Sequence, residues 1–501
     1  MNPIFIRPNR EEFWRHARFG NMIPVYTELV SDCETPVSAF QKLSGEECCF
    51  LLESAERKDQ TCRFSFLGVQ PALLIESIGS RVTITDRGQV TEFESDDPLG
   101  ELKKLMQRYR PVKVIDEIPF CGGAVGYFAY DMVQKFEPSV PSHPKDELGL
   151  PDMLFMVADT LLIFDHRYRQ LKIVANALIE NNEVDSAYDA AVERIREILE
   201  RLAVRRRVKP INTLEPISPV QVSANTEKAE FLQMVRDAKE HIRAGDIFQV
   251  VLSQRFETKF SYQPTDLYRC LRYINPSPYM FCLHFPGRFS LVGSSPETHV
   301  RSIDGKVEIR PIAGTRPRGK TQEEDDAHAQ DLLADPKERA EHIMLVDLAR
   351  NDVGRISEYG SVKVSDFMIV ERYSHVMHIV SHVTGKLRSG CDAYDVFRAT
   401  FPAGTVSGSP KVRAMQIISE LEKSKRCAYS GAVGYFGFDG NHDSCITLRS
   451  VVIQDGKVYA QAGAGIVADS MPENEYQECV NKAMAVMRAI EQCQQMHESG
   501  S

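Results

Sequence analysis

The chain has 501 residues, of which 43% are hydrophobic and 26% are charged. This composition is typical of one large or two intermediate globular domains, and it excludes disordered and collagen-like chains. Lysines and arginines number 60 against 70 aspartates and glutamates, which gives a net charge of −10. A dispersed negative charge argues against general binding to nucleic acid or to an acidic membrane surface.

The sequence indicates a reduced, cytoplasmic protein. The first residues have no apolar signal core, so we expect no secretory leader. The best apolar run, 153–164, is too short for a membrane span and is interrupted by Asp159 and Thr160. The 12 cysteines include no C-x-x-C pair. In a chain of this length, that pattern favours buried free thiols over disulfides or zinc sites.

The first part of the chain mixes short β-like runs with helical stretches. Strands are expected at 50–52, 72–75 and 81–85, and a charged helix at 184–202. An arginine triplet and three prolines follow, a composition typical of a linker. We therefore expect these regions: an N-terminal region 1–205, a linker 206–224, a second region 225–495 and a tail 496–501.

The second region has clearer boundaries between its elements. Helical spacing at 231–242 predicts a helix that ends near Gly245, and 247–256 reads as a strand. Asp-Gly turns predict two hairpins, with strands at 298–303 and 307–312 and then at 444–453 and 458–462. Hairpins with interspersed helices indicate an α+β fold rather than alternating βαβ units.

One hexapeptide, GAVGYF, occurs at 123–128 and again at 431–436. Two similar glycine-kinked strands that pack against other backbone would explain it. A duplicated architecture, in which both halves supply similar sheets, would explain it as well. A single repeat does not decide between these two interpretations.

Two pairs of glutamates spaced three apart are candidate ligands. Glu338 and Glu341 follow a helix start at Asp335-Pro336, and Glu475 and Glu478 follow one at Ser470 and Pro472. E-x-x-E also occurs elsewhere in the chain, so spacing alone favours an ordinary solvated face. On an apolar helix face, however, such carboxylates need a cation, and oxygen ligands without histidine or cysteine suit Mg²⁺.

Several other residues have a structural and a functional interpretation. The loop 403–411 either holds an anion at the start of a helix capped by Ser409 or forms a plain turn. Arg449 is either a solvent-exposed residue of an edge strand or an inward-facing residue that binds a carboxylate or phosphate. Taken alone, His378 is more often a hydrogen-bonded core histidine than a catalyst.

The second region resembles the chorismate-utilising enzymes, and the whole chain is similar to the large (aminase) subunits of anthranilate synthases. The amino-terminal half matches more sparsely, through LLES from Leu51 and 122–127. The main motifs are GDIFQVVLSQRF from Gly245, NPSPYMF from Asn275, VGSSPE from Val292, PIAGTRPRG from Pro311, ERAEHIMLVDLARND from Glu338, VMHIVSHVTG from Val376, FPAGTVSGSPK from Phe401, YSGAVGYF from Tyr429, QAGAGIVADS from Gln461 and the ENEYQE beyond it.

The resemblance implies large antiparallel β-sheets packed as a sandwich with flanking helices, and a site that binds chorismate with Mg²⁺. The metal positions are Glu338, Glu341, Glu475 and Glu478. The substrate positions are Gly314, Thr315, Tyr429, Arg449, Gly463, Ala464, Gly465 and Lys482. The catalytic positions are Glu297, His378 and Thr405.

The reaction implied by the resemblance has two steps. Ammonia adds at C2 while Glu297, as general acid, protonates the departing C4 hydroxyl, which gives 2-amino-2-deoxyisochorismate. Loss of the C2 proton, a step associated with His378, and of pyruvate then yields anthranilate. Relatives that add water carry a lysine base where this chain has Gln249. Relatives that make 4-amino-4-deoxychorismate carry a nucleophilic lysine at the position of Ala313.

The resemblance also implies feedback inhibition by tryptophan, the end product of the pathway that this step begins. The matching positions are Glu53, Ser54, Pro278, Tyr279 and Met280, and Arg63 matches loosely. A carboxylate pairs with the amino group of an amino acid, and apolar atoms contact an indole. Without the resemblance, Glu53-Ser54 would read as a surface turn and Tyr279-Met280 as strand core.

The sequence contains no glutaminase domain with a nucleophilic cysteine. We therefore expect a hetero-oligomer, in which a glutamine amidotransferase small subunit supplies ammonia. The alternatives are an aminodeoxychorismate or aminodeoxyisochorismate synthase, or a non-catalytic tryptophan-sensing protein. The glutamates and Arg449 argue against a pure sensor, because a sensor has no need of that pocket.

Overall fold

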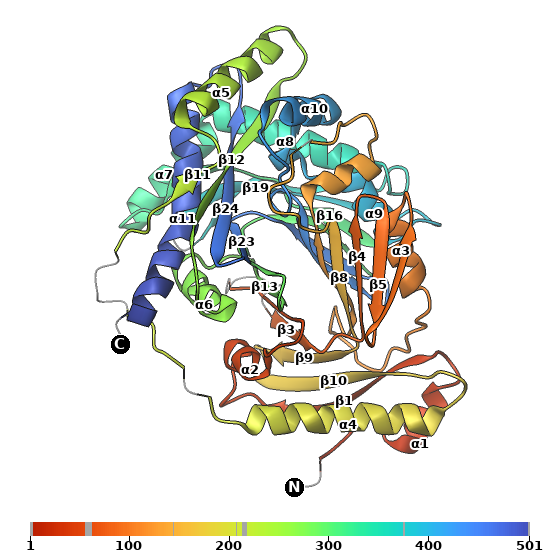
Figure 1. Cartoon of the computed structure of the whole chain (residues 1–501). Coiled ribbons are helices and arrows are strands. Elements are labelled where there is room, and N and C mark those ends of the chain that lie inside the picture. Colours follow the sequence, from red (N-terminus) through yellow and green to blue (C-terminus); the bar gives the residue numbers. More distant parts are fainter. Residues whose placement is uncertain are drawn as a thin grey trace.

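The structure is a computed structural model that describes residues 4–55, 63–143, 145–206, 208–212, 218–373 and 376–498. Two large antiparallel sheets form its centre, and most helices lie outside them (Figure 1). This arrangement confirms the expected α+β class. None of the described helices is long and apolar enough to cross a membrane. The cysteines of the described segments are free thiols.

The first sheet runs through strands from both ends of the chain. Its order is β1 (Met22–Val30), β10 (Gln170–Leu178), β9 (Thr160–Asp165), β3 (Phe64–Val69), β2 (Cys49–Glu53), β13 (Tyr279–Phe285), β14 (Phe289–Ser295), β23 (Ser450–Gln454), β24 (Lys457–Ile466), β12 (Gln249–Lys259) and β11 (Ser223–Ala224), with β20 (Gly408–Ser409) also paired to β12.

The second sheet is built in the same way. Its order is β17 (Ile312–Pro317), β19 (Val376–Lys386), β16 (Lys306–Ile309), β15 (Thr298–Ile303), β22 (His442–Ile446), β21 (Ala432–Gly437), β7 (Gly123–Phe128), β8 (Met153–Ala158), β4 (Leu73–Ile78), β5 (Arg81–Asp86) and β6 (Gln89–Glu94), with β18 (Lys363–Arg372) also paired to β19.

The helices cover the outer faces and the ends of the sheets. They are α1 (Arg10–His16), α2 (Pro36–Leu43), α3 (Pro98–Met106), α4 (Val184–Ala203), α5 (Lys228–Arg243), α6 (Pro264–Ile274), α7 (Gln322–Ala334), α8 (Pro336–Gly354), α9 (Ala393–Thr400), α10 (Lys411–Leu421) and α11 (Pro472–Glu498), with short 3₁₀ turns at Tyr130–Lys135 and Gly404–Val406. Helix α4 packs on β10 and β1, and α11 packs on β24 (Figure 1).

The two halves of the chain are interleaved as a duplicated arrangement. In the first sheet, β10-β9-β3-β2 meets β13-β14-β23-β24; in the second, β16-β15-β22-β21 meets β7-β8-β4-β5. The GAVGYF strands β7 and β21 pair with each other, with Gly126 opposite Gly434. A Cβ on Gly126 would lie 2.0 Å from the carbonyl oxygen of Leu154, which explains the glycine. The structure therefore favours the duplication interpretation.

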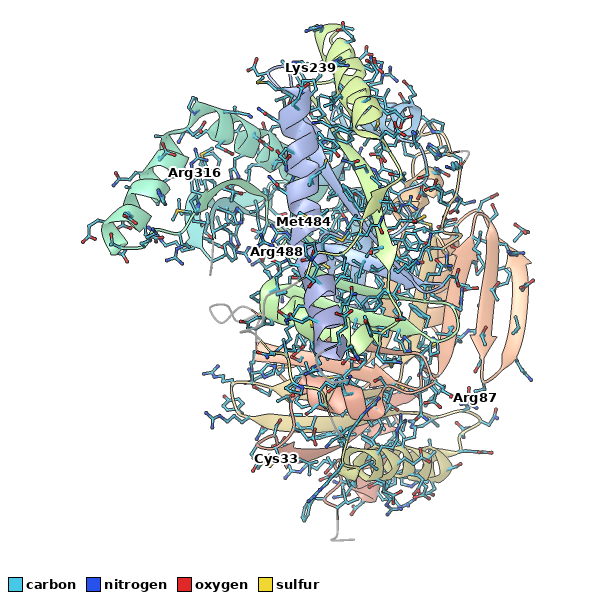
Figure 2. The ribbon with its side chains drawn as sticks, turned by 60° about the vertical axis from the view of Figure 1, so that its left-hand side comes forward. Cys33, Arg87, Lys239, Arg316, Met484 and Arg488 are labelled. Carbon is cyan, nitrogen blue, oxygen red and sulfur yellow. The ribbon has the colours of Figure 1, made fainter. Side chains whose placement is uncertain are left out.

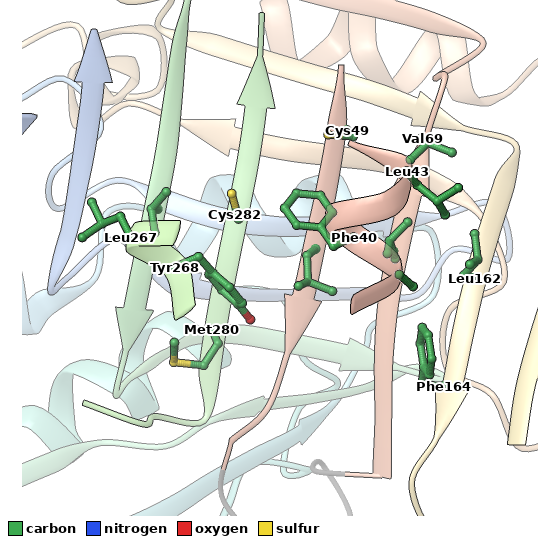
Figure 3. Close-up of a cluster of buried hydrophobic side chains, with 14 of the residues drawn as sticks. Phe40, Leu43, Cys49, Val69, Leu162, Phe164, Leu267, Tyr268, Met280 and Cys282 are labelled. Atoms are coloured by element: carbon green, nitrogen blue, oxygen red, sulfur yellow. The ribbon is translucent and has the colours of Figure 1, made fainter. Parts of the chain in front are cut away.

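The junction of the halves in the first sheet lies over a buried core. Phe40 of α2 and Tyr268 of α6 pack with Met280 and Cys282 of β13 (Figure 3). Helix α2 precedes β2 as α6 precedes β13, so this core repeats the duplication. The boundaries 1–205, 206–224 and 225–495 stay a prediction, because strands from both regions share each sheet.

Two neighbouring chain segments pass from one sheet to the other at the same level. Strand β14 of the first sheet continues into β15 of the second through Pro296 and Glu297. Antiparallel to it, β22 continues into β23 through 447–449. The predicted continuous strand 444–453 is therefore wrong. It breaks at Arg449, whose φ is +46°, because each half of the apolar run pairs in a different sheet.

Candidate functional site

A cavity of about 300 Å³ opens where the two crossovers meet β12, β24, α8 and α11. Most of the residues predicted for catalysis, substrate binding and metal binding face it. These are Glu297, His378, Thr405, Gly314, Thr315, Tyr429, Arg449, Gly463, Gly465, Lys482, Glu341, Glu475 and Glu478.

Two predicted residues lie outside the cavity lining. Glu338 binds Arg316, whose place is labelled in Figure 2, with 3.3 Å between Glu338 Oε1 and Arg316 Nη1. Arg316 also binds Asp331 and Asp335. Ala464 lies between two cavity-lining glycines of β24, so strand alternation turns it into the buried core on the other face.

Glu297 lies at the first crossover, where its carbonyl oxygen accepts a hydrogen bond from the Ile446 amide at 3.0 Å. Burial raises the pKa of its carboxyl group to about 7, although Thr405, Lys482 and Arg449 favour the charged form. Much of this group is therefore protonated near neutral pH. A carboxylic acid in this state is suited to donate a proton.

Arg449 lies at the second crossover and faces the same space. Burial lowers the pKa of its guanidinium group, which the charge of Glu297 opposes. Among the described residues, its side chain makes one long hydrogen bond, 3.4 Å, to Asn275 Oδ1 and forms no ion pair. A buried guanidinium group with free donors is suited to bind a carboxylate in bidentate fashion.

A lysine and the hydroxyl of Thr405 also line the cavity. Lys482 of α11 pairs with Glu478 at 2.7 Å and donates to the carbonyl oxygen of Gly463 at 3.0 Å. The Thr405 hydroxyl is buried close enough to Glu297 to favour its charged form, but it has no well-formed hydrogen bond within the described part of the chain. A buried hydroxyl of this kind is available to a ligand.

His378 of β19 is held in one tautomer. Its Nδ1 donates to the carbonyl oxygen of Gly314 at 2.7 Å, and Thr315 Oγ1 lies 3.1 Å away. Burial lowers the pKa of the ring, which the Gly314 contact opposes. The imidazole is therefore neutral near pH 7, with an unprotonated Nε2. That is the form of a general base.

Three carboxylates approach the cavity from two helices. Glu341 comes from α8, and Glu475 and Glu478 come from the first turns of α11. Burial and the charges of Glu338 and Glu478 raise the pKa of Glu341, and burial raises the pKa of Glu475. Glu475 is buried and Glu341 is half-buried, whereas Glu478 is exposed. Carboxylates that repel one another at one cavity, with oxygen donors alone, fit a hard divalent cation such as Mg²⁺. Within the described residues, no three of these side chains converge closely enough to form a finished cage.

The loop 403–411 serves a structural purpose in this fold. The predicted cap is wrong: Pro410 is the N-cap residue of α10, and no side chain caps that helix. Ser409 instead pairs with β12, and its carbonyl oxygen accepts from the Phe248 amide at 2.7 Å. Lys411 binds Asp352 of α8 at 2.8 Å. Of the loop, Thr405 and Val406 line the cavity.

Sequence reasoning missed some cavity residues. Lys337 and Gln461 line the cavity, and Gln249, weighed only as a departure from relatives, does so as well. The spacing of Lys337, four residues before Glu341 on α8, was a usable signal. Gln461 offered none, because a polar residue on a strand is usually solvent-exposed.

A second cavity of about 290 Å³ lies between β2, β13 and the second sheet. Glu53, Ser54, Pro278, Tyr279 and Met280 all line it. Arg63, the loose match, does not; it binds Asp165 instead, with 2.8 Å between Nη2 and Oδ2. The lining residues that sequence reasoning missed include three basic ones: Arg301 on β15, Arg310 directly after β16 and His382 on β19.

The second cavity has defined polar contacts. Glu53 Oε2 accepts from the Tyr268 hydroxyl at 2.5 Å and lies 3.2 Å from Arg272 Nε. The Tyr279 hydroxyl lies 3.1 Å from Thr298 Oγ1. Thr298 directly follows Glu297, so the first crossover separates the two cavities.

The sequence of the chain is similar to those of known proteins. The family model for chorismate binding enzymes matches residues 47–488. Anthranilate synthase component 1 of Acetivibrio thermocellus is 46% identical over 489 residues, which are 97% of this chain and 98% of that protein. The protein of the same name from Aquifex aeolicus is 47% identical over 491 residues, covering 97% and 98%.

Solved structures agree with the sequence relatives. Anthranilate synthase component I from Streptococcus pneumoniae superposes with a TM-score of 0.76 at 38% identity, covering 92% of this chain and 99% of that one. The menaquinone-specific isochorismate synthase of Escherichia coli reaches 0.72 at 18% identity, covering 96% and 98%, and shares the fold. The chain therefore belongs to the family of chorismate binding enzymes.

Proposed function

We propose that the protein is the aminase subunit of an anthranilate synthase, a lyase that converts chorismate and ammonia to anthranilate and pyruvate. The observation that carries this proposal is the convergence of Glu297 and Arg449 from two crossovers on one cavity, opposite the carboxylates of α8 and α11. The full-length similarity to anthranilate synthase component 1 proteins supports it. The reaction would be the first step of tryptophan biosynthesis, in the cytoplasm.

Binding in this proposal depends on complementary charge. Chorismate carries two carboxylates, and Arg449 has free guanidinium donors in the cavity wall. Lys482, the Gly463 and Gly465 backbone and Tyr429 line the same space. Glycine at these two positions lets the substrate lie directly against β24.

In the first step, ammonia attacks C2 while the C4 hydroxyl leaves. Glu297 donates the proton that turns the departing hydroxyl into water, so the products are 2-amino-2-deoxyisochorismate and water. Gln249 lines the cavity but is an amide, which cannot act as a base to activate water. Ala313 cannot attack the ring as a lysine would. Both residues fit the addition of free ammonia.

In the second step, His378 removes the C2 proton through its unprotonated Nε2. The ring becomes aromatic as the bond between C3 and the ether oxygen breaks, and the enolpyruvyl group leaves as pyruvate after taking up a proton. The Gly314 carbonyl oxygen keeps the other hydrogen on Nδ1, so the basic nitrogen is always the same one.

The cofactor in this proposal is Mg²⁺, held by Glu341, Glu475 and Glu478, with Glu338 in the next layer behind Gly314. When bound, such an ion neutralises and orients a substrate carboxylate. The carboxylates of α8 and α11 would thus act on the substrate through the ion that they hold, and Arg449 would act on it directly.

Ammonia would come from a partner. The relatives are named component 1, which implies a second component. We propose that a glutamine amidotransferase small subunit hydrolyses glutamine and delivers ammonia to this cavity within a hetero-oligomer.

The second cavity would bind tryptophan as a feedback inhibitor. Its size and its apolar walls of Pro278, Tyr279 and Met280 suit an indole ring. Glu53 and Ser54 would bind the amino group, and Arg301 or Arg310 the carboxylate. Tyr279 contacts Thr298, the residue after Glu297. A bound inhibitor that moved Tyr279 would therefore change the position of the general acid.

The proposal is tested with purified protein, chorismate, ammonium at alkaline pH and Mg²⁺, with anthranilate followed by its fluorescence. We expect anthranilate without any partner, its loss with EDTA and its suppression by tryptophan. A non-aromatic amino product would favour aminodeoxychorismate or aminodeoxyisochorismate synthase. Tryptophan binding without chorismate turnover would favour a sensor.

A further inference from the structure

A buried ion pair lies directly behind the catalytic cavity. Glu422 and Arg426 belong to the segment between α10 and β21, and their side chains are 4% and 1% exposed. Arg426 Nε and Nη2 donate to the two carboxylate oxygens of Glu422 at 2.9 and 2.6 Å. Neither residue lines the cavity. A buried pair of this kind is tolerated only when its remaining donors and acceptors are also satisfied.

The remaining donors of Arg426 all bind segments that form the cavity wall. Nη2 donates to the carbonyl oxygen of Val251 at 2.7 Å, and Nη1 donates to that of Val406 at 2.7 Å and to Ser430 Oγ at 3.4 Å. The five N–H hydrogens of the guanidinium group are thereby all used. Val251 and Val406 line the cavity, and Val406 directly follows Thr405.

Two further contacts extend this network toward Tyr429 and Gln461, which also line the cavity. The guanidinium carbon lies 5.7 Å from the ring centroid of Tyr429, whose hydroxyl lies against Gly463. Glu422 Oε1 also accepts from the amide and the hydroxyl of Ser253 at 2.8 and 2.9 Å. Ser253 Oγ in turn accepts from Gln461 Nε2 at 2.9 Å. The ion pair is therefore bonded directly to β12 and to the segment that carries Thr405, and through Ser253 it reaches Gln461 of β24.

We propose that Arg426 and Glu422 are positioning residues of the catalytic site, which keep the Thr405 hydroxyl beside Glu297 and Tyr429 against the substrate. This inference rests on the proposed function. Only arginine can make all of these contacts. Its planar guanidinium group binds a carboxylate and two carbonyl oxygens at once, whereas the lysine ammonium group is a single point of charge.

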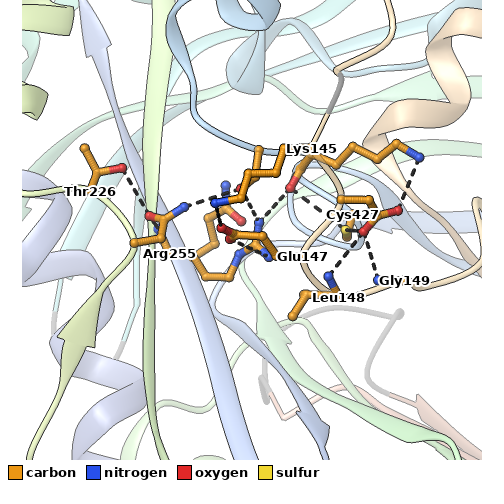
Figure 4. Close-up of polar contacts among 12 residues, drawn as sticks. Lys145, Glu147, Leu148, Gly149, Thr226, Arg255 and Cys427 are labelled. Carbon is orange, nitrogen blue, oxygen red and sulfur yellow. Dashed lines mark hydrogen bonds and ion pairs between the residues drawn. The ribbon is translucent and has the colours of Figure 1, made fainter.

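A neighbouring arginine supplies a matched control. Arg255 of β12 is also buried, and its Nη2 donates to Ser424 Oγ at 2.9 Å and to the carbonyl oxygen of Lys425 at 2.7 Å (Figure 4). It thus anchors the same segment as Arg426, through two residues that lie between Glu422 and Arg426 in the chain. Neither of its acceptors lines the catalytic cavity.

The test compares Arg426→Lys with Arg255→Lys in the full-length protein. Chorismate turnover is measured from pH 6 to 9, about the range in which Glu297 titrates, with rates referred to the free ammonia present. For Arg426→Lys we expect kcat to fall about tenfold or more, with a smaller change in KM.

The alkaline limb of kcat/KM should also move to higher pH, because Glu297 loses the Thr405 contact that favours its charged form, while Lys482 and Arg449 still face it. Arg255→Lys should lower only the melting temperature.

A second variant covers the case in which Arg426→Lys does not fold. The double change Glu422→Leu and Arg426→Met removes both charges, so no lone charge stays buried. It should fold and show the same loss of kcat and the same shifted limb. Wild-type kcat and pH profile in either folded variant would overturn the inference, as would failure of every variant to fold, since the pair would then be structural alone. If wild-type protein makes no anthranilate, the proposed function fails instead.

Discussion

His378 Nδ1 lies 2.7 Å from the carbonyl oxygen of Gly314, and this contact keeps the hydrogen of the neutral ring on Nδ1, which leaves Nε2 as the basic nitrogen of a residue that lines the catalytic cavity. The contact is local, because Gly314 belongs to β17 and His378 to the neighbouring strand β19. Burial lowers the ring pKa against the opposing effect of this contact and keeps the imidazole neutral. Strand pairing therefore determines the tautomer of the base, and burial determines its charge.

The first prediction concerns that base. In His378→Gln, the amination step should persist while the aromatisation falls by about a hundredfold or more, because no group removes the C2 proton. Liquid chromatography of the products should show a non-aromatic amino acid in place of fluorescent anthranilate. The control is His284→Gln, on β13, whose Nδ1 contacts Ser290 Oγ at 2.7 Å outside the cavity. Anthranilate at the wild-type rate in His378→Gln would rule out this assignment.

The second prediction concerns the general acid. Because burial raises the pKa of Glu297 to about 7, its protonated form is lost as the pH rises through 7. The value of kcat/KM for chorismate, referred to free ammonia, should therefore fall above pH 7. The limb in kcat should lie at higher pH, because the bound anionic substrate further disfavours the carboxylate.

Glu297→Gln should remove that limb and lower kcat by about 10² to 10⁴-fold, the range typical of a lost general acid. The matched control is Glu491→Gln, a buried glutamate near the far end of α11 that accepts a hydrogen bond from the Val220 amide. An unchanged pH profile in Glu297→Gln would show that another group titrates.

The third prediction concerns the metal carboxylates. Burial and neighbouring charges raise the pKa of Glu341, so its ionised form opposes folding once the pH exceeds that pKa. In metal-free protein at pH 8, Glu341→Gln should therefore raise the melting temperature. The same change should remove most of the further rise that Mg²⁺ produces in wild-type protein, because a ligand is lost.

Glu473→Gln is the control. Glu473 lies on the first turn of α11 together with Glu475, but it is exposed and outside the cavity. It should leave both melting temperatures unchanged. A lower melting temperature in metal-free Glu341→Gln would contradict the repulsion that we infer.

The fourth prediction concerns inhibition. Ser54→Ala should raise the tryptophan concentration for half-inhibition several-fold and leave uninhibited turnover unchanged, because Ser54 lines only the second cavity. We prefer it to Glu53→Ala, which would leave the buried Tyr268 hydroxyl without its carboxylate partner. Ser139→Ala, an exposed loop serine, is the control. Equal loss of turnover and inhibition would argue against a separate regulatory pocket.

Local chemistry made several elements predictable. Asp335 caps α8 by accepting from the amides of Lys337 and Glu338, as its sequence position suggested. Asp304 and Gly305 both have positive φ, as the turn of the β15–β16 hairpin requires. These signals lie within a few residues of the structure that they specify.

Long-range packing could not be read in the same way. The break at Arg449 was missed because the apolar run is buried on both sides of it, in two different sheets. Ser409 was taken for a cap because Ser-Pro often begins a helix, whereas its backbone pairs with β12. Glu341 and Glu475 line one cavity only because of how α8 and α11 pack. The spacing of the glutamates therefore predicted a pair on each helix, and only the resemblance to the family predicted that the two pairs share a metal site.

The most direct test of the central claim is the position of a bound divalent ion in a crystal grown with chorismate and Mn²⁺, a substitute for Mg²⁺ that scatters anomalously. We predict one strong anomalous peak in the catalytic cavity, between Glu341 of α8 and Glu478 of α11. A peak outside that cavity, or no peak beside bound chorismate, would contradict the claim.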